Sequence, residues 1–308
     1  MGMEGNARNV LRAGQTPRRW MAAAVAVVAL ITAVSCEAAG GPQRATVSGL
    51  GAGLSWWKIP SATESGRWVY FGSVDSAAQN TGPRVLIIPG GGGQVSVDVK
   101  AQAKAYAAAG LRPLIACIAT ITGMWEPSPA TGCPGTPAAK PGHLAAGREV
   151  ANVVDALRAK YPSLRSNPNG LVIVGDSYGG AAAIHAAELT RYRHPVVTVN
   201  GTNTWRGATK PVVPGGDVDP AAPQMLDRIE APIAQVVGAD DEMVPPGVAI
   251  NFARFAAEAG RSVPVLSIRG ADHIGPINAD PGSCAVRQVV MVITALASAQ
   301  SPASRSAC

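Results

Sequence analysis

The hexapeptide Gly-Asp-Ser-Tyr-Gly-Gly at 175–180 has the clearest potential for chemistry in the chain. Ser177 follows the apolar run 171–174, which we predict to be a buried strand, and precedes a helical pattern over 178–190. A serine on such a sharp strand-to-helix turn keeps its hydroxyl accessible, and the glycines beside it avoid clashes within the turn. The helix N-terminus also directs backbone N–H groups toward developing negative charge. We therefore predict a nucleophilic serine, with an ordinary strand-to-helix turn as the alternative.

Two later loops contain the residue types that would complete this chemistry. Asp240 and Asp241 follow one strand-like run, and His273 follows the next. Parallel strands present the residues after their carboxyl ends at one edge of the sheet. An imidazole there can take the serine proton, and a carboxylate can fix its tautomer. Adjacent carboxylates on one loop cannot be separated without geometry, so both aspartates remain candidates. The other histidines, which we expect to be structural or exposed, are His143, His185 and His194.

A glycine-rich loop, Pro-Gly-Gly-Gly-Gly at 89–93, follows the strand-like run 85–88. Glycines let backbone amides approach a substrate carbonyl without a Cβ in the way. The candidate oxyanion donors are the N–H of Gly91 or Gly92, together with the N–H of Tyr178. The alternative, a phosphate-binding P-loop, is excluded because no Gly-Lys-Ser/Thr follows.

The elements that would position these residues alternate along the chain. Strand-like runs are predicted at 68–71, 85–88, 114–118, 171–174, 195–199, 233–237 and 263–268. Helical patterns are predicted at 99–109, 144–160, 178–190, 246–259 and 285–298. This alternation over 308 residues predicts an α/β fold with a doubly wound, mostly parallel sheet flanked by helices. The segments 119–142 and 200–220 interrupt it, and their Trp125 and Trp205 are candidate pocket walls or core residues.

These motifs, spanning roughly residues 84–275, resemble those of the α/β-hydrolase superfamily, in which chain order runs serine, acid, histidine. The resemblance implies a triad of Ser177, Asp241 and His273, with Asp241 preferred because the pattern is G-x-x-D-x-x-V-P. It implies an acyl-enzyme on the serine and needs no cofactor or metal. Esterases of this superfamily often have His-Gly-Gly-Gly in the glycine-rich loop, whereas this chain has Pro89 in place of the histidine. No segment is long enough for a large cap domain.

Three functions are compatible with these motifs. The chain resembles small secreted esterases and dienelactone-hydrolase-like proteins, which implies a small-molecule or lipid ester substrate. Dienelactone hydrolases proper use a cysteine nucleophile, so their substrate does not carry over. The serine motif is also similar to that of prolyl-oligopeptidase-like peptidases, which usually have a large N-terminal propeller for which there is no room here. The third possibility is a surface lipoprotein that binds without cleaving, although no triad member has been lost.

The N-terminus has the composition of a targeting segment. Arg12, Arg18 and Arg19 precede the apolar run 20–34. That run is shorter than the roughly 20 residues that span a bilayer, and it matches the apolar region of a signal peptide. We predict a signal peptide at 1–35, with an uncleaved anchor helix as the alternative.

The leader ends in Ala-Val-Ser-Cys at 33–36, which resembles the lipobox of bacterial lipoproteins, where the cysteine is acylated. Ala-Val-Ser would also suit ordinary signal peptidase. We therefore expect an exported protein of the cell envelope, anchored to the membrane if Cys36 is acylated, or else secreted. A tether at 36–53 and a catalytic domain at 54–308 would follow.

The remaining cysteines number four, which suits disulfides in an oxidising compartment. Nearest-neighbour pairing would join Cys117 to Cys133 and Cys284 to Cys308, although four cysteines allow three connectivities. Histidines and cysteines are not clustered at ligand spacing, which argues against zinc. The net charge of +6 includes +3 from residues 1–35, and the body has no run of lysines or arginines. This pattern gives no indication of a nucleic-acid partner.

Overall fold

The computed structural model describes residues 41–45, 53–90, 97–118, 143–190, 192–201, 226–277 and 282–302. All of them belong to one compact unit that covers residues 39–308. Within these ranges, no helix has the length and apolar character needed to cross a membrane.

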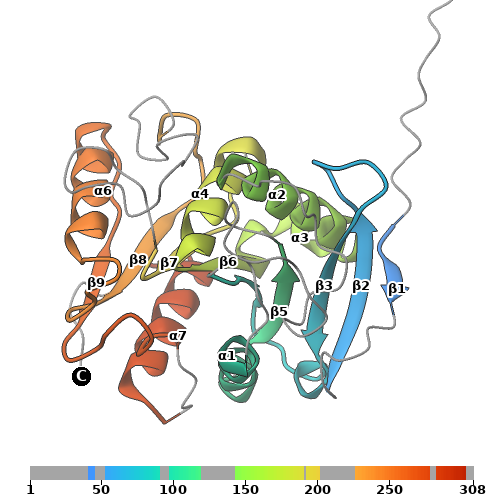
Figure 1. Cartoon of the computed structure of the whole chain (residues 1–308), viewed down its shortest axis with the longest axis horizontal. Coiled ribbons are helices and arrows are strands. Elements are labelled where there is room, and N and C mark those ends of the chain that lie inside the picture. The colour runs from blue at the N-terminus through green and yellow to red at the C-terminus, as the bar shows by residue number, and fades with distance from the viewer. Residues whose placement is uncertain are drawn as a thin grey trace, which may run out of the picture. The chain divides into compact units, whose positions relative to one another are not determined.

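A nine-stranded sheet forms the centre of this unit, in the order β1-β2-β3-β5-β4-β6-β7-β8-β9 (Figure 1). Its strands are β1 (Gln43–Ala45), β2 (Leu54–Pro60), β3 (Trp68–Val74), β4 (Arg84–Ile88), β5 (Arg112–Cys117), β6 (Leu171–Asp176), β7 (Val196–Val199), β8 (Ile233–Gly238) and β9 (Val265–Ile268). The six strands from β5 to β9 in this spatial order are parallel, whereas β1, β2 and β3 add an antiparallel extension beside β5. We call the end where the parallel strands begin the amino edge and the end where they finish the carboxyl edge.

Helices cover both faces of the sheet, as alternation of strands and helices requires. The principal helices are α1 (Val97–Ala108), α2 (His143–Lys160), α4 (Tyr178–Thr190), α6 (Gly247–Glu258) and α7 (Cys284–Ala297), with a short α3 (Ser163–Ser166). Side chains of α2, α4 and α6 share one buried cluster, and those of α1 and α7 share a second cluster on the opposite face. Figure 1 shows these two layers of helices on either side of the sheet.

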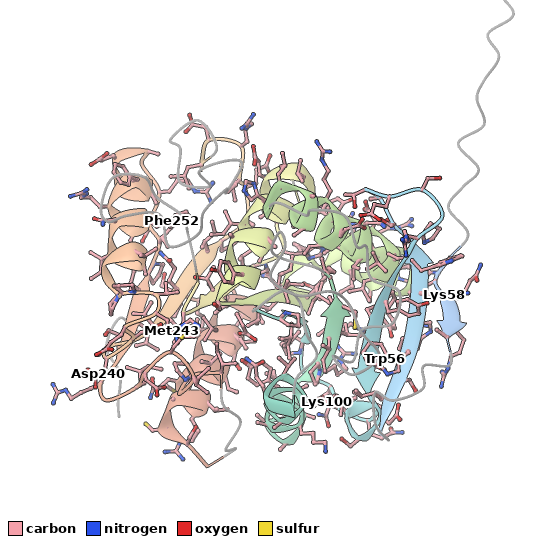
Figure 2. All side chains as sticks on the ribbon, viewed as in Figure 1. Trp56, Lys58, Lys100, Asp240, Met243 and Phe252 are labelled. Atoms are coloured by element: carbon pink, nitrogen blue, oxygen red, sulfur yellow. The ribbon has the colours of Figure 1, made fainter. Side chains whose placement is uncertain are left out.

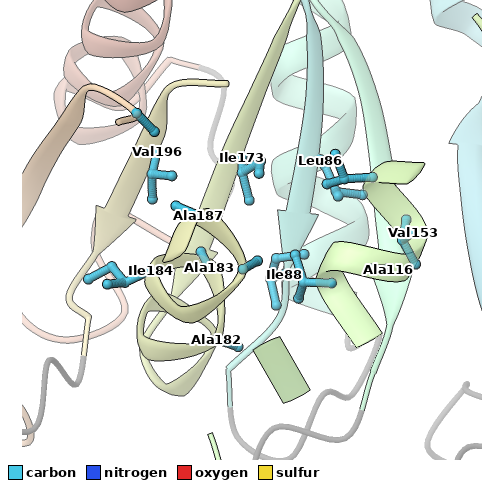
Figure 3. Close-up of a cluster of buried hydrophobic side chains, with 14 of the residues drawn as sticks. Leu86, Ile88, Ala116, Val153, Ile173, Ala182, Ala183, Ile184, Ala187 and Val196 are labelled. Atoms are coloured by element: carbon cyan, nitrogen blue, oxygen red, sulfur yellow. The ribbon is translucent and has the colours of Figure 1, made fainter. Parts of the chain in front are cut away.

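Small side chains let α4 lie close to the sheet. Ala182, Ala183 and Ala187 are fully or almost fully buried against strand residues such as Ile173 (Figure 3). Helix α2 packs on α4 so closely that a Cβ on Gly147 would lie 2.4 Å from the Cβ of His185. These small residues let α4 lie close to both the sheet and α2, which sets the position of the turn at the N-terminus of α4.

The predicted strands and helices are all present, with ends shifted by a few residues. β1 and β2 were not predicted, and β1 lies inside the segment 36–53 that we assigned to a tether. β1 pairs with β2, where Arg44 donates a hydrogen bond to the Ser55 hydroxyl at 3.0 Å. Residues 43–45 thus belong to the sheet, because their backbone pairs with that of β2.

Two of the four body cysteines lie in the described ranges. Cys117 is buried at the end of β5, and Cys284 begins α7. Cys133 and Cys308 lie outside the described residues, so the pairing of the four cysteines remains a prediction.

Candidate active site

Ser177 occupies the turn between β6 and α4 in a strained conformation. Its φ of 48° is in the left-handed region, where residues other than glycine rarely lie. Its N–H donates to the carbonyl of Val199 at 2.8 Å, which ties the turn to β7. A Cβ on Gly175 would lie 2.3 Å from the Gly179 carbonyl oxygen, and one on Gly179 would lie 2.1 Å from that of Ile88. The turn therefore requires glycine at both positions, as the sequence indicated.

His273 connects the serine to an acidic residue. Its Nε2 lies 3.1 Å from Ser177 Oγ, and its Nδ1 lies 2.8 Å from Asp241 Oδ2. Asp241 Oδ1 accepts two backbone hydrogen bonds, from Met243 N at 2.9 Å and Val244 N at 2.8 Å. The serine, histidine and aspartate are all buried. Three predicted residues from three different loops thus form one continuous chain of hydrogen bonds.

The carboxylate that contacts His273 is Asp241 rather than its neighbour. Asp240 is exposed, and its backbone N–H donates to the carbonyl of Ala271 at 2.9 Å. Figure 2 shows Asp240 beside Met243 at the β8–β9 end of the molecule, far from Trp56 and Lys58. The backbone of the loop, which the sequence does not specify, turns one aspartate inward and the other outward.

Asn200, which sequence analysis did not single out, links the acid and histidine loops. It follows β7 with a φ of 47° and is fully buried. Its Oδ1 accepts from Gly238 N at 2.7 Å, and its Nδ2 donates to the carbonyl of His273 at 2.6 Å and that of Asp272 at 3.3 Å. The sequence did contain a signal for this residue, an asparagine directly after a buried strand. Asparagine tolerates the left-handed conformation, so it is a typical residue for a tight turn at that place.

The glycine-rich loop begins against the serine. A Cβ on Gly90 would lie 2.7 Å from the Cβ of Ser177 and 2.8 Å from the carbonyl oxygen of Asp176. Gly91 and Gly92 lie outside the described residues, so their role as oxyanion donors is untested. Tyr178 begins α4 directly after the serine, as predicted.

Comparison with known proteins gives the architecture a name. No protein-family model matches the sequence, and no curated protein matches it either. Among solved structures, the esterase Est22 aligns with a TM-score of 0.59 and 16% identity, over 80% of this chain and 81% of that one. A puromycin-hydrolyzing peptidase of Mycobacterium tuberculosis aligns with a TM-score of 0.54 and 19% identity, over 83% of this chain and 40% of that one. The chain has the α/β-hydrolase fold. At these identities the likeness establishes the architecture alone.

Asp176, the residue before the serine, has a second buried carboxyl group. Asp176 ends β6 and points to the α1 side of the sheet, where its Oδ1 accepts from Gln102 Nε2 at 3.2 Å. Gln102 Nε2 also lies 3.1 Å from the Tyr106 hydroxyl. Asp176 Oδ2 has no hydrogen-bond partner in the described part of the chain. Burial raises the pKa of Asp176 to about 7, although the Gln102 hydrogen bond opposes this shift.

The remaining histidines lie away from this chain of hydrogen bonds. His185 is buried in α4 with Nδ1 3.4 Å from Glu188, and burial lowers its pKa to about 4. His194 is buried before β7 with Nδ1 2.7 Å from the carbonyl of Pro168. His143 begins α2. In the described ranges, no group of three or more histidine, cysteine or acidic residues is arranged to hold a metal ion. Further predicted residues that lie outside those ranges are Cys36, Trp125 and Trp205.

Proposed function

We propose that this chain is a serine hydrolase that cleaves carboxylic esters through an acyl-enzyme on Ser177. The observation that carries the proposal is the chain of hydrogen bonds from Ser177 Oγ through His273 to Asp241, with distances of 3.1 and 2.8 Å. This geometry suits proton removal from the hydroxyl by a histidine whose tautomer is fixed by a carboxylate. The α/β-hydrolase fold and its esterase neighbour support the same chemistry.

In the proposed mechanism, His273 Nε2 takes the Ser177 proton as Oγ attacks the ester carbonyl carbon. The developing oxyanion is held by the N–H groups of Tyr178 and of Gly91 or Gly92. The tetrahedral intermediate collapses, and His273 returns the proton to the departing alcohol. Water then attacks the acyl-enzyme by the reverse proton path, which releases the carboxylic acid and restores the serine. Asp241 stabilises the charged imidazole in both halves of the reaction.

Two exposed apolar residues that are close in sequence to Asp241 and His273 favour a substrate with an apolar part. Met243 is 64% exposed on the acid loop, and Ile274 is 43% exposed directly after His273. Exposed apolar side chains at a catalytic centre offer contact area to a ligand, whereas they gain nothing from water. We infer an ester of a small molecule or lipid, whose acyl or alcohol group would contact Met243 and Ile274.

Hydrolysis of p-nitrophenyl acetate, butyrate and octanoate by the full chain tests the proposal, beside a panel of aminoacyl-p-nitroanilides. We expect ester turnover that falls at least about a thousandfold in Ser177→Ala. Anilide turnover above ester turnover would instead favour a peptidase, for which the structural likeness to a peptidase is the supporting observation. Turnover of neither substrate class, or equal turnover by Ser177→Ala, would contradict the proposal and favour a binding protein that keeps the fold.

We further propose that the protein is exported. Residues 1–35 would act as a signal peptide, and Cys36 would be acylated and attach the mature chain to a membrane. Disulfides between Cys117 and Cys133 and between Cys284 and Cys308 would suit an oxidising compartment. Mass spectrometry of the protein from its membrane fraction would detect a lipid mass at Cys36, and a peptide map without reduction would identify the pairs. A chain that retains residues 1–35 would contradict the signal peptide.

A further inference from the structure

A pocket with a volume of about 430 Å³ lies at the amino edge of the sheet, away from Ser177. Arg84 and Arg112 begin the parallel strands β4 and β5 and line it, whereas the catalytic serine follows the opposite end of β6. Ser55 and Ser73 of the antiparallel extension line the same pocket. The pocket therefore has its own polar groups, and none of them belongs to the proposed catalytic site.

The register of the strands places the two arginines and the two serines on the same face of the sheet. Arg84 pairs with Arg112, and Ser55 pairs with Ser73. Side chains alternate between faces along a strand, so Arg84 shares the face of Leu86 and Ile88, which α2 covers. Helix α2 ends at Lys160. Beyond the helix end, this face of the sheet presents arginines and serines instead of apolar residues.

Positively charged side chains gather around the pocket, which has one acidic residue in its lining. Arg84 stacks on Tyr161 with its guanidinium 3.6 Å from the ring centroid, and Lys160 Nζ lies 4.4 Å from the ring centroid of Trp57. In the described part of the chain, Arg44, Arg84, Arg112 and Lys160 form no ion pair, whereas Arg67, Arg193 and Arg228 each have a glutamate partner.

The one acidic residue that lines the pocket, Asp75, accepts a hydrogen bond from Ser55 at 2.6 Å. It offsets only part of the charge. Burial and then the neighbouring Arg84 lower the pKa of Arg112, and burial followed by Arg44 and Arg84 lowers the pKa of Lys160. Two like charges directly opposite each other in a sheet are destabilising. The arrangement is unfavourable for the free protein and would be relieved by an anion.

The arginines also have unused hydrogen-bonding capacity. Arg112 Nε donates to the carbonyl of Gly82 at 2.7 Å, and its terminal nitrogens donate no hydrogen bond to any residue that the structure describes. Arg84 donates no hydrogen bond to a protein oxygen within the described ranges. Two adjacent guanidinium groups, with the Ser73 hydroxyl in the same pocket, match the tetrahedral oxygens of a phosphate group. The pocket is larger than a phosphate ion, and the half-buried Tyr161 ring and the exposed Ala78 offer apolar contact to an organic group beside the phosphate.

We propose that this pocket binds the phosphate group of a phosphorylated molecule, through Arg84, Arg112 and Lys160, at a distance from the ester site. The phosphate belongs either to a free small molecule or to the headgroup of a phospholipid. The proposal does not depend on the catalytic role of Ser177, because it rests on charges at the other edge of the sheet.

Thermal unfolding of the full chain in inorganic phosphate, against sodium chloride at equal ionic strength, tests the proposal. We expect phosphate to raise the Tm by roughly 2–4 °C once its concentration exceeds the Kd several-fold. The double variant Arg84→Gln/Arg112→Gln should lose this rise. Arg254→Gln is the matched control, because Arg254 is an exposed arginine stacked on Phe255 in α6, and it should keep the full rise. Lys160→Gln leaves β4 and β5 unchanged and should reduce the rise in Tm. It replaces the double variant in this test if the double variant does not fold.

Vesicle sedimentation distinguishes the two sources of phosphate. Binding to phosphatidylglycerol but not to phosphatidylcholine vesicles, lost in the double variant and inhibited by phosphate, would identify a lipid headgroup. A phosphate-dependent rise in Tm with no preference between the vesicles would identify a free phosphorylated molecule. A Tm that rises no more in phosphate than in chloride, or equally in all variants, would overturn the proposal.

Discussion

At the carboxyl edge of the parallel strands, the polar atoms of His273 and Asp241 are used in hydrogen bonds within the protein. At the amino edge, Arg84 and Lys160 lie near a pocket without an acidic partner in the described part of the chain. A catalytic group has to be held in position before substrate arrives, because preorganisation is what lowers the barrier. A group that binds a charged ligand keeps its hydrogen-bonding capacity for that ligand. The two edges of one sheet thus have two different kinds of site, and the following variants test this difference.

The largest effect is expected for the aspartate that contacts His273. Asp241→Asn preserves shape but removes the charge that orients and stabilises the imidazole. We expect kcat/KM for p-nitrophenyl butyrate to fall by about 10³–10⁴. Asp240→Asn on the same loop should leave it nearly unchanged, because Asp240 is exposed. Similar losses in the two variants would contradict the assignment of the acid.

Asn200→Ala should separate activity from stability when it is paired with Asn80→Ala. Each asparagine donates to two main-chain carbonyls, but Asn80 bonds Ala107 and Leu111 near the amino edge. Both variants should lose about 1–3 kcal/mol in free energy of unfolding, measured by urea denaturation. Only Asn200→Ala should also lower kcat, by roughly 10- to 100-fold, because it releases the His273 loop. An equal loss of kcat in both would show a general effect of destabilisation.

Asp176 is the exception at the carboxyl edge, because one of its oxygens has no partner in the described part of the chain. Its pKa is raised from 3.8 to about 7 in the folded state, so the folded protein binds more protons than the unfolded chain between these values. This contribution to stability is present below pH 4 and is lost as pH rises to about 7, at no more than about 1.4 kcal/mol per pH unit.

Asp176→Asn should therefore reduce the fall in the free energy of unfolding between pH 4 and pH 7. Urea denaturation across this range measures it, with Asp240→Asn as the exposed control. An unchanged pH profile in Asp176→Asn would indicate that the buried carboxyl group does not titrate in this range.

The smallest effect concerns charge at the amino edge. Raising sodium chloride from about 0.01 M to about 0.1 M shortens the Debye length from about 30 Å to about 10 Å. Repulsion among Arg44, Arg84, Arg112 and Lys160 should then weaken, and the parent should gain a few tenths of a kcal/mol in phosphate-free buffer. The free energy of unfolding of Arg84→Gln should rise less on adding salt than that of Arg254→Gln. Equal gains would mean that the arginines do not repel each other measurably.

Much of the fold follows from local sequence. The runs of β-branched and aliphatic residues in β4 and β6 are apolar throughout because both faces of these strands are covered. β1 was missed because three residues, of which two are exposed, have no periodicity of their own. β2 was missed although it contains the buried Trp56 and Trp57. Its pairing with β3 decides its conformation.

The sequence by itself determined the serine turn, because the glycines at 175 and 179 and the flanking strand and helix are local features. It also determined His273, since few histidines exist and one follows a strand. Only the tertiary structure decided that Asp241 rather than Asp240 faces the histidine, because neighbouring residues differ by a backbone rotation. It also decided that Arg84 lies beside Arg112, because parallel register joins strands that are separated in sequence by a helix. Contacts between segments that are distant in sequence depend on how the elements pack, and a local sequence pattern does not specify that packing.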